Sequence, residues 1–482
     1  MKITNLKNFE TLLYTAAVLF SIFYVVILHS ALGGGFIAGA DWNNPATKQQ
    51  YNRSLEVFTS TWADNWYLGA RNSTHTNLWY ILFTTTLSHI LTDLTLIPVI
   101  VIVLTQVLAL VTTYWFLKDL GKSKPSALLA GIFLATSPIF FNYLTMGWIY
   151  VLMAFSFLNL SLLFIRRGLM KGKTSNILLA GVFFGLSFAQ SQAILWIPLV
   201  VTSYVLFENL GNIGIKRKFL AIVLFLFTGI LINAPTVLEI IFVPNRMLLS
   251  NTIVTTGVSV GTSVYATPIN LIRLLGSGFN SQYETSQEGV LFTLVSFLLP
   301  LLLITLLINR NKDRASVIMG FFLLLFVPVT AYIIGGNREL MAKIPGSAIF
   351  RDVARFSFVS TYASAILLGI FLDQAKKYTQ PVKQIVYLLV VLWLSVAILP
   401  WLNGALIKQP ARSGPDVRLR SVVYPEDYFN LEEKLSSDTE AYRVLFLPAG
   451  GSLDITNDRD FNGAYREMQD IFAGYSPSPG GL

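Results

Sequence analysis

Long apolar runs separated by short basic segments dominate this chain. A membrane-spanning helix needs about 20 apolar residues, and single runs of that kind cover residues 11–30, 95–117, 218–243, 289–308, 315–335, 353–372 and 384–403. Two longer stretches, 125–165 and 176–208, each predict a pair of helices. Ser137-Pro138 and Gly147 mark a break in the first, and Gln190-Ser191-Gln192 mark one in the second. The pattern predicts an all-α polytopic membrane protein with about eleven transmembrane helices.

The basic residues follow the turns between these runs. With the N-terminus inside, each short inner segment is basic: Lys2 and Lys7; Lys118, Lys122 and Lys124; Arg166, Arg167, Lys171 and Lys173; Lys216, Arg217 and Lys218; Arg310, Lys312 and Arg314; Lys376, Lys377 and Lys383. This is the positive-inside pattern. It predicts a multi-pass protein of the cell (plasma) membrane with a cytoplasmic N-terminus and an external C-terminus, and outer segments at 31–93, 244–288 and 336–350.

Composition agrees with this topology. Hydrophobic residues make up 54% of the chain and charged residues 13%, so a soluble fold is disfavoured. The net charge of +9 reflects the inner turns, which leaves little support for a nucleic-acid partner. The absence of cysteine excludes a disulfide framework and a Cys-based zinc site. The apolar run in residues 1–30 is long for a cleavable signal peptide and is interpreted as a retained first span.

The outer segment 31–93 is too long for a simple connector. Asn44-Pro45 is a typical helix start and predicts a helix from Pro45 to about Thr61. A second helix is expected over Leu78–Leu91, either flat in the membrane interface or as a partial span. Trp42, Trp62, Trp66 and Trp79 fall here and fit either an aromatic interface belt or a platform for a sugar or lipid headgroup.

Histidines and aspartates also gather near this segment: His29, His75, His89, Asp41, Asp64 and Asp93. Such a set could bind a divalent metal such as Mg or Mn, although no spacing matches a known metal motif. The alternative is a set of hydrogen-bonded polar residues in a hydrated loop. No cofactor is required by the sequence, and a divalent metal is left open.

Two further outer segments carry arginines. Segment 244–288 contains Arg246 and a predicted short helix over Pro268–Leu275, and it could be a lid that orders on substrate or a plain surface loop. In Phe350-Arg351-Asp352-Val353-Ala354-Arg355-Phe356, Arg351 and Arg355 share one helix face. Cations at the outer N-terminal end of a helix oppose the helix dipole, which suggests a bound phosphate gripped by both guanidinium groups. The alternative is local pairing with Asp352.

The tail, 404–482, turns polar. Ala441–Pro448 reads as a strand ending in a turn. One strand is too little for a stable sheet. The expected organisation is a membrane domain over 1–403 and a short external α/β segment over 404–482, with the start of a larger outer domain left open as an interpretation of the second.

Several of these pieces together resemble the GT-C superfamily of polytopic glycosyltransferases, in particular its arabinofuranosyltransferase-like members. The resemblance rests on Ala40-Asp41-Trp42 after the first span, Trp66-Tyr67-Leu68-Gly69, Thr136-Ser137-Pro138 with Met146-Gly147, and Phe350–Phe356. It implies transfer of a hexose or pentose from a polyprenyl-phosphate donor to a glycan, lipid or protein acceptor of the cell envelope, on the outer face. It also implies an acidic catalytic residue in the first outer loop, and Asp41 matches that position. Asp41-Trp42-Asn43 lacks the second carboxylate of the paired acidic motif that family members often have, which favours a metal-independent base.

The chemistry of the residues fits this activity. An acceptor hydroxyl needs a base to remove its proton, and Asp41 is the candidate. The departing polyprenyl phosphate develops negative charge, which Arg351 and Arg355 could stabilise. Asp64, Trp42, His75 and Arg246 are secondary candidates. A lipid or polysaccharide transporter and a non-catalytic envelope scaffold remain as alternatives; the few mid-span charges and the lack of a visible repeat argue against the transporter.

Overall fold

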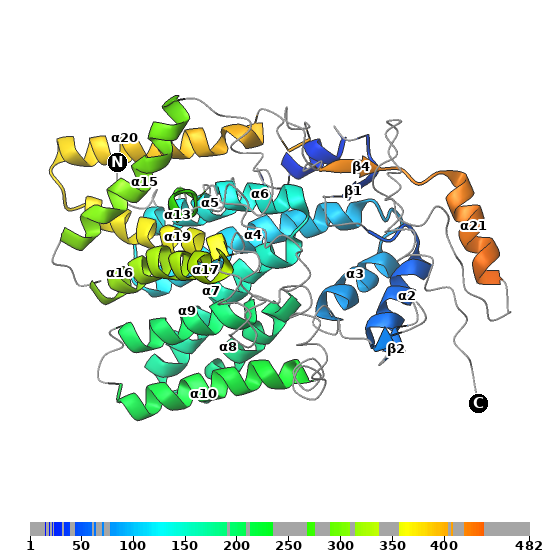
Figure 1. Ribbon diagram of the computed structural model, residues 1–482, viewed down its shortest axis with the longest axis horizontal. Coiled ribbons are helices and arrows are strands. Elements are labelled where there is room, and N and C mark those ends of the chain that lie inside the picture. Colours follow the sequence, from blue (N-terminus) through cyan, green and yellow to red (C-terminus); the bar gives the residue numbers. More distant parts are fainter. Residues whose placement is uncertain are drawn as a thin grey trace. The chain divides into compact units, whose positions relative to one another are not determined.

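In the computed structural model the chain is mostly helical, and it divides into two compact units (Figure 1). The structure describes residues 15, 19, 22, 24–30, 33–38, 44–59, 62–63, 70–71, 78–189, 193–208, 213–234, 268–274, 290–308, 314–336, 356–402, 406–407 and 419–437. The first unit comprises Met1–Ile22 and Val103–Arg418, and the second comprises Phe23–Ile102 and Leu419–Leu482.

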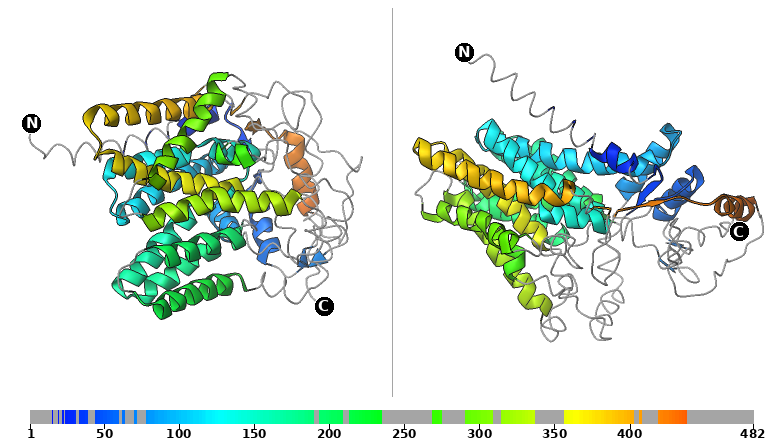
Figure 2. Two further views of the ribbon diagram at one scale, coloured as in Figure 1. Left: turned by 60° about the vertical axis from the view of Figure 1, so that its left-hand side comes forward. Right: turned by 90° about the horizontal axis from the view of Figure 1, so that it is seen from above.

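The first unit is a bundle of apolar helices (Figures 1 and 2). Its helices are α4 (Leu96–Asp119, whose first turns belong to the second unit), α5 (Lys124–Thr136), α6 (Pro138–Met146), α7 (Ile149–Lys171), α8 (Thr174–Leu186), α9 (Ala193–Phe207), α10 (Ile215–Ile232), α13 (Pro268–Ile272), α15 (Val290–Ile308), α16 (Arg314–Phe321), α17 (Val327–Gly336), α19 (Ser357–Ala375) and α20 (Gln380–Leu402). A 3-10 turn, η2 (Ser187–Ala189), and a π-helical segment, η3 (Phe322–Phe326), complete it.

The predicted break in the stretch 125–165 is confirmed. Gly147 ends α6 with φ at 78°, a left-handed conformation that glycine adopts without strain. The Trp148 N–H donates to the Tyr143 carbonyl at 2.9 Å, so the chain turns directly into α7. A second, milder break separates α5 from α6, because Pro138 lacks an N–H and Ser137 instead caps the new helix by accepting from Phe140 N. The Thr136 carbonyl at this break accepts a hydrogen bond from Trp401 Nε1 at 3.0 Å.

The predicted pair of helices in 176–208 is also confirmed, as the short helices α8 and α9. Residues 190–192, the expected break, lie outside the described part of the chain. Helix α8 packs on α10 through small residues, since a Cβ on Gly181 would lie 2.5 Å from the Thr228 Cβ. Gly181-Val-Phe-Phe-Gly185 thus forms a small-xxx-small surface, which lets two membrane helices approach closely.

Helix α19 lies at the centre of the bundle. Nearly all of its residues are buried. It packs against α5, against α16 through Leu367 and Gly320, and against α4 through Leu117 and Gly369. The helix carries Ser and Thr on turns that face other helices, and these residues allow close packing where lipid tails provide no hydrophobic driving force.

The second unit combines two helices, a small strand pair and part of the tail. Strand β1 (Phe36–Ala38) pairs antiparallel with β4 (Arg420–Val422), in the register Phe36↔Val422, Ile37↔Ser421 and Ala38↔Arg420. Helices α2 (Lys48–Thr59) and α3 (Leu78–Ile90) pack on each other, and α21 (Glu426–Ser437) follows β4. Between α2 and α3 in sequence, two short strands pair antiparallel with each other: β2 (Trp62–Ala63) and β3 (Ala70–Arg71).

Five helices in the described residues are long and apolar enough to cross a membrane: Leu96–Asp119, Lys124–Met146, Ile149–Lys171, Ser357–Ala375 and Gln380–Leu402. Four shorter apolar helices accompany them, over Thr174–Leu186, Ala193–Phe207, Leu294–Leu307 and Ser316–Phe326. The chain therefore has the character of a helical membrane protein, while the number of eleven spans stays a prediction. The domain boundary at 403–404 also stays a prediction.

Candidate functional site

The residues that the sequence singles out for chemistry lie outside the described part of the chain. They are Asp41, Trp42, Asp64, His75, Arg246, Arg351 and Arg355. Their roles stay predictions. The structure does describe residues on both sides of Asp41, and the residue that directly follows Arg355. These flanks show how firmly the fold holds the chain on which the candidates sit.

Strand β1 ends three residues before Asp41. Its partner β4 comes from the C-terminal tail, so a segment more than 380 residues away in sequence supports the approach to Asp41. Gly35 allows this pairing, because a Cβ at that position would lie 2.8 Å from the Val422 carbonyl oxygen. The sequence pattern does not predict this strand, because three apolar residues next to glycines are too few for a periodic signal.

Asn44 fixes the chain three residues after Asp41. Its side-chain Nδ2 donates to the Ile37 carbonyl at 3.0 Å, and its own carbonyl accepts from the Tyr424 hydroxyl at 3.0 Å. Asn44 is buried; its bond to Ile37 is made away from water, and its bond from Tyr424 is partly buried. The segment 39–43 therefore begins and ends at residues that are tied to each other and to the tail.

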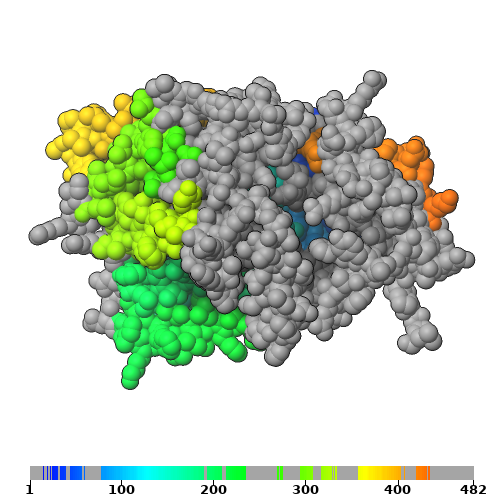
Figure 3. Space-filling view, viewed as in Figure 1, coloured from blue at the N-terminus to red at the C-terminus, as the bar shows by residue number. Residues whose placement is uncertain are grey.

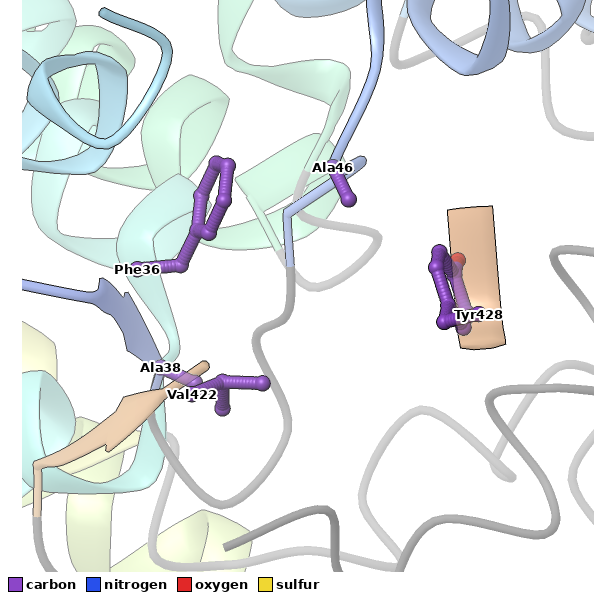
Figure 4. Packing of buried hydrophobic residues seen from close by; sticks show 5 residues of the cluster. All are labelled: Phe36, Ala38, Ala46, Val422 and Tyr428. Carbon is purple, nitrogen blue, oxygen red and sulfur yellow. The ribbon is translucent and has the colours of Figure 1, made fainter. Parts of the chain in front are cut away.

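A compact apolar cluster backs this arrangement. It consists of Phe36, Ala38, Ala46, Val422 and Tyr428, with Leu94 and Tyr424 packed against it (Figure 4). The Tyr424 ring lies edge-on to Phe36 at 5.6 Å and beside Tyr428 at 4.6 Å. The cluster contains residues of β1, of the chain just before α2, and of β4 and α21 in the tail. These segments therefore share one small hydrophobic core.

The start of α2 differs from the sequence prediction. The helix begins at Lys48, not at Pro45, and Thr47 is its N-cap: Gln50 N donates to Thr47 Oγ1 at 3.2 Å, and Gln50 Oε1 accepts from Ala46 N at 2.8 Å. This resembles a capping box, except that the Gln50 side chain accepts from the residue before the N-cap. Asn44 does not cap the helix because α2 begins four residues later, at Lys48, whereas an N-cap lies directly before the first helical residue. Its side-chain nitrogen donates to the Ile37 carbonyl instead. Gln50 also donates through Nε2 to the Tyr428 hydroxyl at 2.9 Å, which links the helix start to the tail.

Helix α3 confirms the second predicted helix and is fastened to α2. Thr85 Oγ1 donates to the Tyr51 carbonyl at 3.1 Å, and His89 Nε2 lies 2.8 Å from Asn52 Oδ1. Burial, and next the nearby Tyr424, raise the pKa of Tyr51, so its hydroxyl stays protonated throughout the physiological range.

Two members of the possible metal set have other partners. His89 bonds to Asn52, and Asp93 accepts from the backbone and hydroxyl of Thr95 at 2.9 Å and 2.6 Å. Among the described residues no three His, Asp or Glu side chains gather as a metal site would require. His75, Asp41 and Asp64 lie outside those residues, so a divalent metal stays an open expectation.

The flank of the arginine pair is the start of α19. Phe356 is buried, and Ser357 Oγ lies 2.9 Å from the Tyr143 hydroxyl of α6. Phe358 stacks on Phe155 with ring centroids 3.6 Å apart. The chain that follows Arg355 is therefore packed into the bundle, which would give Arg355 a firm base.

A neutral polar network lies within the bundle. Asn159 of α7 donates to Thr112 Oγ1 and Thr113 Oγ1 of α4 at 3.2 Å and 2.8 Å, and its Oδ1 accepts from the Tyr362 hydroxyl of α19 at 3.1 Å. All of these residues are buried. The network joins three helices, and its spacing in sequence offers no periodic signal by which it could have been predicted.

Arg273 is a charged residue of segment 244–288 that the structure describes. Its Nε donates to Ser296 Oγ at 2.7 Å, its Nη1 donates to Asn270 Oδ1 at 3.0 Å, and the guanidinium lies 4.8 Å from the centroid of the Phe297 ring. These neutral partners hold the short helix α13, near the predicted Pro268–Leu275, against α15. The cation–π contact is of a kind that favours Arg over Lys.

No family model matches this chain, and no curated protein matches it.

Proposed function

We propose that this chain is a membrane glycosyltransferase that transfers a sugar from a polyprenyl-phosphate donor to an acceptor of the cell envelope, with Asp41 as the general base. The proposal combines the resemblance to the GT-C superfamily with the apolar helices of the bundle. A bundle of this kind suits a donor whose polyprenyl chain lies in the bilayer. The sugar and acceptor are left as classes, a hexose or pentose and a glycan, lipid or protein.

One observation carries the proposal furthest: both ends of the segment that contains Asp41 are held in place. Ala38 is paired to β4, and Asn44 is bonded to Ile37 and Tyr424. A general base must be held within hydrogen-bonding reach of the hydroxyl whose proton it takes, and sites on well-supported chain are more exact than sites on long free loops. The residues that flank Asp41, Ala38 before it and Asn44 after it, are both bonded to other parts of the second unit and offer that support.

The departing phosphate needs positive charge where it forms. Arg351 and Arg355 are the candidates, and the chain that follows them enters the buried start of α19 at Ser357. Two guanidinium groups can bind a phosphate through paired hydrogen bonds and stabilise the charge that develops on it. Two arginines in this role would make a metal unnecessary for stabilising the departing phosphate.

The transporter alternative has less support. In the described helices of the bundle, the buried polar network of Asn159, Thr112, Thr113 and Tyr362 is neutral, and the ion pairs of Asp119 lie at helix ends. Transporters that couple to ions or protons usually carry ionisable groups within their spans. A scaffold protein would need neither Asp41 nor the arginines, so the experiment below separates it from an enzyme.

The test is Asp41→Asn, assayed with the purified full-length chain and a panel of polyprenyl-phosphate-linked hexose and pentose donors. Release of polyprenyl phosphate should fall by about 100-fold or more, the scale of general base catalysis, while donor binding persists because Asn is isosteric. Asp64→Asn is the matched control and should lose less. Near-normal turnover in Asp41→Asn would remove Asp41 from the mechanism, and no turnover of any donor by the unaltered chain would remove the proposed function.

A further inference from the structure

The bundle carries an excess of positive charge at one end. Ion pairs and hydrogen bonds bring the turns of that end together: Arg166 and Arg167 of α7 reach Asp119 of α4, and Lys218 of α10 reaches the Glu208 carbonyl after α9 at 3.3 Å. Asp373, near the end of α19, accepts from Ser123 N before α5 at 3.0 Å. The start of α10 and the turn from α19 to α20 both lie at the left of Figure 1.

The described acids of this end are already engaged. Asp119 is shared by Arg166 at 3.0 Å and Arg167 at 2.9 Å. Glu208 accepts from the Ser316 hydroxyl, and Asp373 accepts from Ser123 N. Each of these three carboxylates therefore already accepts a hydrogen bond or ion pair from another residue of this end.

Four exposed cations form a separate group, which we call the α8–α10 patch: Lys171, Lys173, Lys216 and Arg217. Among the described residues none of the four makes an ion pair, in contrast to Arg166 and Arg167 only a few residues away. Like charges so close together repel one another, so the patch has a strong attraction for an anion.

The backbone brings the four cations together. The contacts of Gly181 with Thr228 and of Gly185 with Ile232 show that α8 and α10 run side by side in the same direction. Helix α10 therefore begins beside the α7–α8 turn. The Arg217 guanidinium lies against Gly172, whose φ is 68°, between Lys171 and Lys173. The first turns of α8 and α10 add the positive ends of two helix dipoles.

Exposed apolar side chains border the patch. Ile215 is 67% exposed and Phe219 is 66% exposed, and both flank Lys216 and Arg217 on α10. Met170 is likewise exposed beside Lys171. Helix α10 is the green element at the lower left of the surface in Figure 3. Cations directly beside lipid-suited apolar side chains are placed at the depth of headgroups.

We propose that the α8–α10 patch is a binding site for the phosphate-bearing headgroup of an anionic phospholipid, such as phosphatidylglycerol, in the leaflet that faces the basic end. The apolar border selects a lipid over a free anion, because it binds acyl chain while the cations bind phosphate. The proposal does not depend on the proposed enzymatic function, and it names a local site in place of a general attraction of the basic end.

The experiment measures lipid binding to the purified full-length chain by native mass spectrometry, with phosphatidylglycerol and phosphatidylcholine of equal chain length. The unaltered chain should prefer phosphatidylglycerol. The double variant Lys173→Gln/Arg217→Gln should lose about tenfold of its affinity for phosphatidylglycerol, since each basic residue near a membrane surface contributes substantially, and should bind phosphatidylcholine as before. The matched control Lys376→Gln/Lys377→Gln removes two charges from the same end and should keep the preference.

The charge-preserving variant Lys173→Arg/Arg217→Lys should also keep it, which separates loss of charge from damage to folding. Equal losses in the α8–α10 variant and in the control would overturn the local site in favour of a diffuse field. An unaltered chain with no preference for phosphatidylglycerol would overturn it as well. If inorganic phosphate at the same concentration displaced the lipid completely, the patch would be a free-anion site and the lipid proposal would be wrong.

Discussion

At the scale of single residues, glycines decide how closely the helices approach. Gly181 and Gly185 of α8 face Thr228 and Ile232 of α10, where an added Cβ would meet atoms at 2.5 Å and 3.0 Å. Gly214, just before α10, has open space around it. The chain offers, within one helix pair, a glycine that packing requires and one that it does not.

Gly181→Ala should therefore destabilise the protein by about 1–3 kcal/mol, the usual cost of adding atoms to a packed interface. Its Cβ would also lie 2.7 Å from the Phe225 carbonyl oxygen, which is backbone and cannot move aside. Thermal unfolding in detergent measures the effect, with Gly214→Ala as the control. Gly214 is the N-cap of α10 and has open space around it, so its substitution should cost only the smaller N-cap difference between Gly and Ala. Equal stability of the two variants would show that α8 and α10 are not packed as described.

The arginine pair is expected to bind the phosphate of the donor. Arg351→Ala or Arg355→Ala should weaken binding of the polyprenyl-phosphate donor by roughly 1.5–3 kcal/mol, the range for hydrogen bonds to charged groups. Lys at either position should restore only part of the loss, because it keeps the charge but not the paired donors. Donor titration followed by tryptophan fluorescence is a suitable measurement. Unchanged affinity in both alanine variants would assign the pair a structural role.

At the scale of elements, the junction of β1, β4 and the start of α2 is the most informative part of the second unit. A three-residue pair has little stability alone. Here it is reinforced by the bonds of Asn44, Gln50, Tyr424 and Tyr428 and by the apolar cluster of Figure 4. The tail is thus part of the support for the Asp41 segment.

A cysteine pair tests the register of these strands. The chain has no cysteine, so introduced thiols are free of any background. Ile37→Cys with Ser421→Cys places two thiols on directly opposite residues, where Cβ atoms of paired strands lie about 4.5–5.5 Å apart. We expect mild oxidation to crosslink this pair efficiently.

The mismatched pair Ile37→Cys with Val423→Cys shifts the partner by two residues and should crosslink poorly, because diagonal neighbours are about 7–8 Å apart. The crosslink is read as a change in gel mobility that a reductant reverses. Preferential crosslinking of the mismatched pair would disprove the register.

At the scale of the whole molecule, the helices of the first unit alternate so that the basic turns collect at one end. The bonds between Arg166 and Asp119 and between Ser123 and Asp373 each join turns that are distant in sequence but belong to the same predicted side. The positive-inside pattern predicts that this end is cytoplasmic.

Single cysteines at Lys173, Lys216 and Lys376 should therefore react with a membrane-impermeant thiol reagent from the cytoplasmic side only. Inverted vesicles and intact cells provide the two sides for comparison. Reporter fusions after Lys124, Lys173, Lys218 and Lys312 should all report cytoplasm. Labelling of any one cysteine from the outside would contradict the alternation of the helices.

The sequence by itself determined the helices and their breaks. Apolar length is a local property, so α4, α7, α15, α19 and α20 match the predicted spans within a few residues. Gly147 and Pro138 act through backbone conformation, which also is local, and the breaks fall where they predict. The charge pattern likewise gave the grouping of the turns. For the candidate site, the sequence predicted which residues carry the chemistry. It could not predict the contacts of the neighbouring chain, such as the pairing of β1 with β4.

Only the tertiary structure decided the contacts between distant segments. Pairing of β1 with β4, the hydrogen bonds of Asn44 and Asn159, and the burial of Gly181 each depend on partners that are far away in sequence or that no periodicity identifies. Asn44 illustrates the difference: its local pattern predicted a helix cap, whereas α2 begins only at Lys48 and the Asn44 side chain donates to the Ile37 carbonyl of β1. A side chain can form only a few hydrogen bonds. Which partners it bonds depends on the segments that packing brings next to it.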